Sequence, residues 1–275
     1  MFEIHTLKMG ELLIPEDGAL LFDPVHVWLV SDGRTRILVD GGMPDIVEVT
    51  RRLKVDGAGG GHESLRKALA AVDLAPEQID FVVVTHLHYD HGSNLDLFPK
   101  ACVVIQRDEL AHATDPVPTQ RPFYFKEALI HVLGRKRPGT LRVVDGDLDL
   151  MEGIRILKLP SHTPGMQVPI VTTARGKVAL VSDLGDHYRN WFPADPRATR
   201  HPLNYLADTF LPSGIRTAAE RDYIACMRRA KDASDIIVPA HDTRIPRHVP
   251  RDWFDLPSEP EPLLIPLRDG GRYES

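Results

Sequence analysis

The stretch THLHYDHGSN, residues 85–94, places three histidines and an aspartate directly after the apolar run FVVV. Polar side chains are costly to bury unless a partner satisfies them, and a divalent metal ion can satisfy several imidazoles and a carboxylate at once. In an extended stretch residues i and i+2 project to the same side, so His86 and His88 can approach one ion together. Asp90 and His91 lie just beyond, where the chain turns, and point elsewhere. This spacing predicts two metal ions rather than one.

Three further candidate ligands stand in matching positions downstream. His162 follows IRILKLP, Asp183 follows VALVS, and His241 follows DIIVP. Each lies at the end of an apolar, strand-like run, where loops from one edge of a sheet converge. Neutral imidazole and carboxylate are the usual ligands of zinc and of other borderline divalent ions.

A lone histidine at a strand end is more often structural than a metal ligand. We therefore assign no metal to the isolated histidines His5, His26, His62, His112, His131, His201 and His248. The HxHxDH pattern is different, because four metal-capable side chains in six positions, with three more at later strand ends, are a rare coincidence.

The elements that must position these residues are interleaved strands and helices. VHVWLV and TRILVDGG predict two strands joined by a turn at Asp32 and Gly33. In ESLRKALAAV, apolar residues recur at i, i+3, i+4 and i+7, which predicts a helix lying on a core. FVVV (81–84) and ACVVIQ (101–106) are typical of strands buried on both faces.

The second half of the chain is predicted to be richer in strands. KEALIHVLG predicts a short helix, whereas LRVV, IRILKL, VPIVTT and KVALVSD predict four strands, and DIIVPAH a last one. In TAAERDYIACMRRA, Thr217 and Glu220 predict a capping box at the start of a helix. The apolar face of that helix comprises Tyr223, Ile224, Met227 and Ala230. We expect one domain over 1–245 and a proline-rich tail over 246–275, because prolines exclude long regular elements there.

The composition favours a cytoplasmic protein that acts on a small molecule. Of the 275 residues, 43% are hydrophobic and 26% charged, enough for a sizeable core. We expect neither a membrane span nor a secretory signal, since no apolar run approaches about 18 residues and no basic region precedes one. Cys102 and Cys226 lie in strand-like and helix-like runs, as small buried hydrophobes in a reducing compartment do. A net charge of −6 with scattered basic residues argues against nucleic acid as a partner, and a homodimer is compatible with the chain.

HLHYDH followed by SHTPG, VSD and PAHD resembles the metallo-β-lactamase superfamily, from ILVDGG (37–42) to PAHD (239–242). The resemblance implies an α/β fold, the αββα four-layer sandwich, with a metal site along one edge of two facing sheets. The ligands that it implies are His86, His88 and His162 for the first metal, Asp90, His91 and His241 for the second, and Asp183 as the bridging carboxylate. Flavin-partnered diiron oxidases of this fold have Glu where this chain has His88, which argues against a redox diiron role.

Within the superfamily, the layout is most similar to N-acyl-homoserine lactonases and related small-lactone hydrolases. They share the compact domain, the final HD, and an insertion near the active site, here residues 107–141 carrying PFYF. Glyoxalase II adds a helical C-terminal domain for which this tail is too short, and RNA-processing members need a basic, elongated surface. One position departs from the lactonases, which commonly have Tyr three residues after the bridging Asp, where this chain has Asp186. Either Tyr188 takes that role, or Tyr188 packs in the loop and Asp186 or His187 faces the site.

The resemblance implies metal-dependent opening of a small lactone ring. Two divalent ions, zinc first and manganese, cobalt or iron as alternatives, share a hydroxide that attacks the carbonyl carbon. The expected catalytic residues are Asp183, Asp90 as the group that passes a proton to the leaving alkoxide, and Tyr188 as an auxiliary donor to the carbonyl. No GxSxG elbow is present for a serine mechanism.

Aromatic residues and one acid of the two overhanging segments are the candidate substrate contacts: Phe123, Tyr124, Phe125, Asp186 and Trp191. Other substrates remain open at this point: a thioester, a cyclic amide or β-lactam, or an aryl ester. A mononuclear iron dioxygenase of the persulfide dioxygenase kind uses the same fold. A non-catalytic protein that keeps metals for structure is disfavoured, because structural zinc sites are usually closed and four-coordinate.

Overall fold

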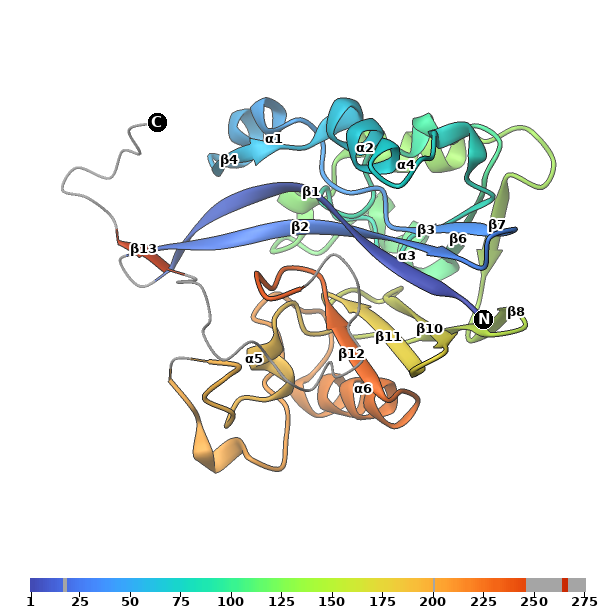
Figure 1. Cartoon of the computed structure of the whole chain (residues 1–275). Helices are drawn as coiled ribbons and strands as arrows, with labels where there is room; N and C mark the ends of the chain where they lie inside the picture. Colours follow the sequence, from blue (N-terminus) through green and yellow to red (C-terminus); the bar gives the residue numbers. More distant parts are fainter. Residues whose placement is uncertain (17–18, 200, 246–263, 267–275) are drawn as a thin grey trace.

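The computed structural model describes residues 1–16, 19–199, 201–245 and 264–266. Two β-sheets face each other, and helices cover their outer faces (Figure 1). The expected αββα sandwich is therefore confirmed. Within the described residues, no helix combines the length and the apolar composition needed to span a membrane.

The larger sheet is built around a long antiparallel hairpin. Its strands run, in spatial order, β4 (Asp56–Gly59), β1 (Glu3–Glu16), β2 (Ala19–Ser31), β3 (Arg36–Val39), β5 (Phe81–Val83), β6 (Cys102–Gln106) and β7 (Leu141–Val144), with β13 (Leu264–Pro266) paired to β2. The β1–β2 pairing runs from Glu3 opposite Ser31 to Glu16 opposite Ala19. From β3 to β7 the neighbouring strands are parallel, so their carboxyl ends meet at one edge.

The smaller sheet has the order β12 (Ile236–Pro239), β11 (Gly176–Ser182), β10 (Gln167–Thr173), β9 (Ile154–Lys158) and β8 (Leu148–Met151). β11 and β12 are parallel, so the segments that follow them leave the sheet at the same edge.

The helices are α1 (Ile46–Leu53), α2 (Gly61–Ala70), α3 (Arg107–Thr114), α4 (Lys126–Leu133), α5 (Tyr188–Trp191) and α6 (Glu220–Asp232). Short 3-10 turns lie at Pro76–Gln78, Leu95–Leu97, Arg121–Phe123 and Asn204–Leu206. Helices α1, α2 and α4 lie over the outer face of the larger sheet, and α6 lies over that of the smaller one (Figure 1).

Alternating side chains of β2 divide the core into layers. Val27 and Leu29 pack with Leu65 and Leu69 of α2 on the helical side of the larger sheet. Trp28 and Val30, one residue out of phase, enter the layer between the two sheets, because successive strand residues face opposite sides. A third cluster joins the smaller sheet to α6, whose residues Tyr223, Met227 and Ala230 are buried as predicted. Ile224, the fourth residue of the predicted face, is only half-buried.

The structure also corrects the sequence-based assignment. Strands β1, β4 and β8 and helices α1, α3 and α5 were not predicted. The predicted capping box is wrong, because α6 begins at Glu220 and its N-cap, Ala219, has no side-chain cap. Thr217 lies outside the helix, and its N–H and that of Ala218 donate instead to the carbonyl of Ser161. The predicted tail lies outside the described residues, apart from β13.

Candidate metal centre

The candidate ligands gather in two adjoining groups of buried side chains. Those of the first group are His86, His88, His162 and Asp183, and those of the second are Asp90, His91 and His241. Within each group the ligand atoms lie within 4.8 Å of one another. All seven predicted metal ligands are thus brought together, and none of the isolated histidines belongs to either group; His248 lies outside the described residues.

Asp183 lies between the two groups and offers one oxygen to each. Its Oδ2 is 3.7 Å from Nε2 of His86 and 3.4 Å from Nε2 of His162. Its Oδ1 is 3.1 Å from Nε2 of His91 and 3.3 Å from Nε2 of His241. A carboxylate in this position is arranged to bridge two cations.

Strand ends and local backbone conformation place these side chains. His86 to His91 follow β5, and the N–H groups of His91 and Gly92 both donate to the carbonyl of His88, which closes the turn. Asp183 follows β11 directly, and the preceding Ser182 has a positive φ of 48°. Left-handed non-glycine residues are uncommon and cluster at functional sites.

Four of the five imidazoles have their Nδ1 nitrogen fixed by an oxygen acceptor. Nδ1 of His162 donates to the carbonyl of Ile215 at 2.7 Å, and Nδ1 of His241 to that of Pro24 at 3.0 Å. Nδ1 of His91 donates to Asp40 at 2.8 Å. Nδ1 of His86 is 3.1 Å from the hydroxyl of Thr85, which itself donates to Asp40. With Nδ1 held in this way, Nε2 of each of these four rings is the nitrogen available to bind a metal.

The donor set fits divalent cations. Nε2 of His91 and Nε2 of His241 face each other at 3.3 Å. Nε2 of His86 is buried and, among the described residues, has no hydrogen-bond partner, and Nδ1 of His88 lies 3.0 Å from Nε2 of His162. Converging lone pairs repel unless a cation lies among them, so these residues are suited to hold one.

Charge at the site also favours cations. Burial lowers the pKa of His86 and of His88 well below the ordinary value, which keeps both rings neutral. Burial by itself would raise the pKa of Asp183, but His91 and His241 hold it well below its usual range. Burial opposes a charge on His91 as well, yet the neighbouring Asp183, Asp90 and Asp40 raise its pKa well above the usual value.

Asp40 is a residue that the sequence assignment missed. It lies at the end of β3 with a φ of 65°, is fully buried, and accepts from the N–H and hydroxyl of Thr85 and from His91. A carboxylate in this place orients the ring and raises the basicity of the ligand. The sequence did contain a feature that could have identified it. Asp40 is the Asp of ILVDGG, and like the candidate ligands it is a polar residue at the end of a strand.

A second outer carboxylate, also missed, is Asp23 of β2. It lies 3.5 Å from Nδ1 of His241 and 3.1 Å from Nε2 of His187. Asp23 thereby connects the larger sheet to the loop that follows Asp183. Nothing in the local pattern around Asp23 distinguishes it from an ordinary surface acid.

Residues 20–241 match the family model of the metallo-beta-lactamase superfamily. The chain belongs to this superfamily. An N-acyl homoserine lactonase from Bacillus cereus is 28% identical over 174 residues, which cover 60% of this chain and 65% of that relative. The chain thus spans slightly less than two thirds of the length of that lactonase.

Solved structures show the same fold at lower identity. A structure of an N-acyl homoserine lactone hydrolase, with the product N-hexanoyl-L-homoserine bound at its catalytic metal center, has a TM-score of 0.65 and 20% identity, covering 88% of this chain and 93% of that one. AidC, a dizinc quorum-quenching lactonase, has a TM-score of 0.57 and 19% identity, covering 81% and 74%.

In this protein the insertion, residues 107–141, packs against the candidate metal centre. The carbonyl of Phe123 accepts from the N–H of Tyr89, between two candidate ligands. The rings of Phe123 and Tyr124 lie 5.5 and 4.8 Å from the ring of His88. The amide of Gln120 donates to the carbonyl of His162 at 2.6 Å. Phe123 and Tyr124 therefore lie beside a candidate ligand, and their contact with substrate stays a prediction.

Three other predicted side chains are buried away from an open surface. Phe125 stacks on Tyr89 at 5.2 Å between ring centres. Trp191 is 2% exposed, and its indole N–H donates to the carbonyl of Gly185. Tyr188 is 1% exposed and packs in the layer between the sheets, 5.6 Å from the guanidinium of Arg244. Their contact with substrate stays a prediction, and it would require these side chains to become accessible.

In the loop that departs from the lactonase pattern, Asp186 is more accessible to solvent than His187. Its side chain is 29% exposed, against 4% for His187, and the two lie 3.5 Å apart. Burial opposes charge on His187, but Asp186 and Asp23 raise its pKa to about 10. Of these two residues Asp186 is therefore the one that faces solvent, and its contact with substrate stays a prediction.

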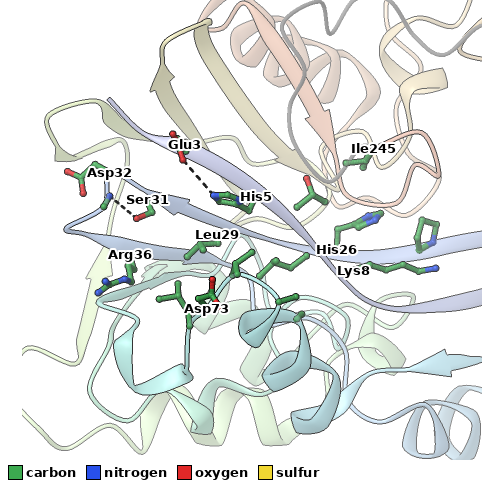
Figure 2. Close-up of a pocket in the computed structure, with 18 of the residues that line it drawn as sticks. Glu3, His5, Lys8, His26, Leu29, Ser31, Asp32, Arg36, Asp73 and Ile245 are labelled. Carbon is green, nitrogen blue, oxygen red and sulfur yellow. Dashed lines mark hydrogen bonds and ion pairs between the residues drawn. The ribbon is translucent and has the colours of Figure 1, made fainter.

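A cavity of about 1030 Å³ lies along the β1–β2 hairpin, apart from this centre. Figure 2 shows its lining, which includes His5, Lys8, His26, Arg36 and Asp73 and none of the seven candidate ligands. Both acidic and basic side chains line it. Its mixed charge identifies no class of ligand.

Proposed function

We propose that this protein is a metal-dependent hydrolase that opens a small lactone ring of the acyl-homoserine lactone class. The observation that carries the proposal is the position of Asp183, with one oxygen facing each group of imidazoles. The B. cereus lactonase supports the substrate class, because it is 28% identical to this chain over 174 residues.

The proposed ligands are the seven buried side chains of the two groups, with Asp183 shared between them. Two bound divalent cations supply Lewis acidity and a water whose pKa is lowered towards about 7. Among first-row ions zinc is proposed, as it accepts this set of imidazole and carboxylate.

The chain itself orients the donors and handles the proton. Asp40, Ile215 and Pro24 hold protons on the outward nitrogens of three rings, so that the inward nitrogens stay free. Asp90 lies 3.8 Å from Nε2 of His241 and 3.9 Å from that of His91. Burial raises the pKa of its carboxyl group, which suits a group that passes a proton to a leaving alkoxide.

Phe123 and Tyr124 are the proposed apolar contacts beside His88, and Asp186 is the proposed polar one. Phe125, Trp191 and Tyr188 belong to this proposal only if the loop exposes them. We place the protein in the cytoplasm and propose a small molecule as its partner; a homodimer is compatible with this function.

The test is a hydrolysis screen of the metal-loaded protein. An acyl-homoserine lactone, an acyl thioester, a β-lactam and an aryl ester are compared by proton release and by the mass of the product. We expect the highest kcat/KM for the lactone and a ring-opened hydroxy acid. A faster thioester or β-lactam reaction would refute lactone specificity and keep the hydrolase.

Metal analysis separates the remaining alternatives. We expect two equivalents of divalent metal per chain. One equivalent of iron together with oxygen uptake would indicate a dioxygenase. Two metals without hydrolysis of any ester, thioester or amide would favour a non-catalytic metal-binding protein.

A further inference from the structure

Glu109, in the first turn of α3, is a buried carboxylate that contacts the loops of the metal centre. It is fully buried, and no basic side chain contacts it among the described hydrogen bonds and ion pairs. Its Oε1 accepts from the N–H of Leu87 at 2.8 Å, and its Oε2 accepts from the hydroxyl of Thr163 at 2.6 Å. Leu87 stands between His86 and His88, and Thr163 follows His162. One carboxylate therefore fastens both loops that carry the imidazoles of the first group.

The same carboxylate holds a residue of the insertion. Oε1 accepts from the hydroxyl of Tyr124 at 2.8 Å, and the ring of Tyr124 meets that of His88 edge to face at 4.8 Å. The Tyr124 hydroxyl is thus occupied by Glu109, and the ring fixes one side of the His88 imidazole.

Gly165, the glycine of SHTPG, leaves room for the first turn of α3, which carries Glu109. A Cβ at position 165 would lie 2.2 Å from the backbone nitrogen of Glu109 and 2.4 Å from its Cβ. Real Cβ atoms essentially never approach so closely, so any side chain at 165 must push α3 away from the loop. The loop and Glu109 are therefore fitted to each other from both sides.

We propose that Glu109 is a positioning residue that sets the metal affinity of the group formed by His86, His88, His162 and Asp183. It acts through its three hydrogen bonds, which hold three imidazoles at one spacing before metal binds. The second group has no contact with Glu109 and is positioned by Asp40 and Pro24 instead. This inference rests on the proposed metal site.

The experiment is a Co²⁺ titration of the chelator-treated, metal-free full chain against a competing chelator dye. The visible absorption of bound Co²⁺ reports its coordination. The wild type should bind two equivalents. In Glu109→Ala, one of the two binding steps should weaken by about 10- to 100-fold, the usual effect of losing an outer partner of a metal ligand, and its absorption bands should change.

Two variants separate positioning from charge and from general stability. Glu109→Gln can keep all three contacts, because its carbonyl accepts from Leu87 and Tyr124 while its amide donates to the Thr163 hydroxyl; its affinity should stay close to that of the wild type. Gln106→Ala is the matched control, since Gln106 is equally buried but bonds only to Gly146 and Gln167. It should leave both binding steps unchanged.

Wild-type affinity in both steps of Glu109→Ala would overturn the inference, as would Glu109→Gln binding as weakly as Glu109→Ala. If Glu109→Ala does not fold, Thr163→Val and Gly165→Ala should each weaken the same single step, and unchanged binding in both would overturn it equally. A wild type that binds no Co²⁺ would refute the proposed metal site itself.

Discussion

The two oxygens of Asp183 face different groups of imidazoles, and this single residue ties the proposed site together. Removing its charge leaves two proposed cations with less negative charge between them. We expect Asp183→Asn to lower bound metal to one equivalent or less and to lower kcat/KM by more than about a hundredfold. Metal analysis and kinetics on the same preparation test this, and full activity in a metal-stripped Asp183→Asn protein would contradict the dimetal hydrolase.

Asp186 is the residue at which this chain differs from the lactonase pattern. A partly exposed carboxylate beside the metals should disfavour anionic substrates. We expect Asp186→Asn to raise the ratio of kcat/KM for an anionic ester to that for a neutral lactone by about tenfold.

Tyr188→Phe is the comparison variant for that loop. Because Tyr188 is 1% exposed, we expect its kcat to stay close to the wild-type value with metal content unchanged. A loss of about 10- to 1000-fold in kcat would instead assign the carbonyl donor to Tyr188.

At the scale of elements, buried side-chain amides join the two sheets beside the metal centre. The Gln167 side chain of β10 donates to the carbonyls of Val84 and Val104 in the larger sheet, and it accepts from Gln106 of β6. The carbonyl of Val104 also accepts from the N–H of Val84, so the Gln167 amide supplies it with a second donor.

Gln167→Leu removes these bonds without opening a cavity. We expect it to lower the free energy of unfolding by about 2–4 kcal/mol, because the buried carbonyl of Val84 loses its donor and the buried amide of Gln106 loses an acceptor. Urea unfolding of the metal-free protein measures this. The control is Gln78→Leu in an exposed 3-10 turn, which removes only an exposed hydrogen bond from the N–H of Ala75. Equal stability of wild type and Gln167→Leu would show that these bonds contribute little.

Elements also show where local sequence reasoning stops. The apolar face of α6 followed from its periodicity, but its start did not. Thr217 and Ala218 donate to Ser161 beside His162 instead of capping the helix. This tertiary contact next to His162 holds Thr217 outside the helix, where it cannot act as the N-cap.

At the scale of the whole molecule, His26 couples the two sheets. It lies on β2, is 6% exposed, and its Nδ1 donates to the carbonyl of Ala240 after β12 at 2.8 Å. Burial lowers its pKa from the ordinary 6.5 to about 4. The unfolded chain therefore binds this proton more readily than the folded one, so the contribution to stability is complete above about pH 6.5 and is lost as the pH falls towards 4.

We expect the metal-free protein to lose roughly 2 kcal/mol through this residue between pH 7 and pH 5. Urea unfolding at both pH values compares the wild type with His26→Gln, which does not titrate. The variant should be less stable at pH 7 and should lose less stability on acidification. An equal loss in both proteins would exclude His26 as the source.

The sequence by itself determined the ligand types, their spacing and most of the strands and helices. HxHxDH is local, and periods of two and 3.6 residues are visible within one element. Only the tertiary structure selected the partners that fix those ligands. Asp40 meets His91 across 51 residues, and Glu109 meets Leu87 across 22 and Thr163 across 54. Hydrogen bonds between distant segments depend on how the sheets and the insertion pack, and no local period encodes that packing.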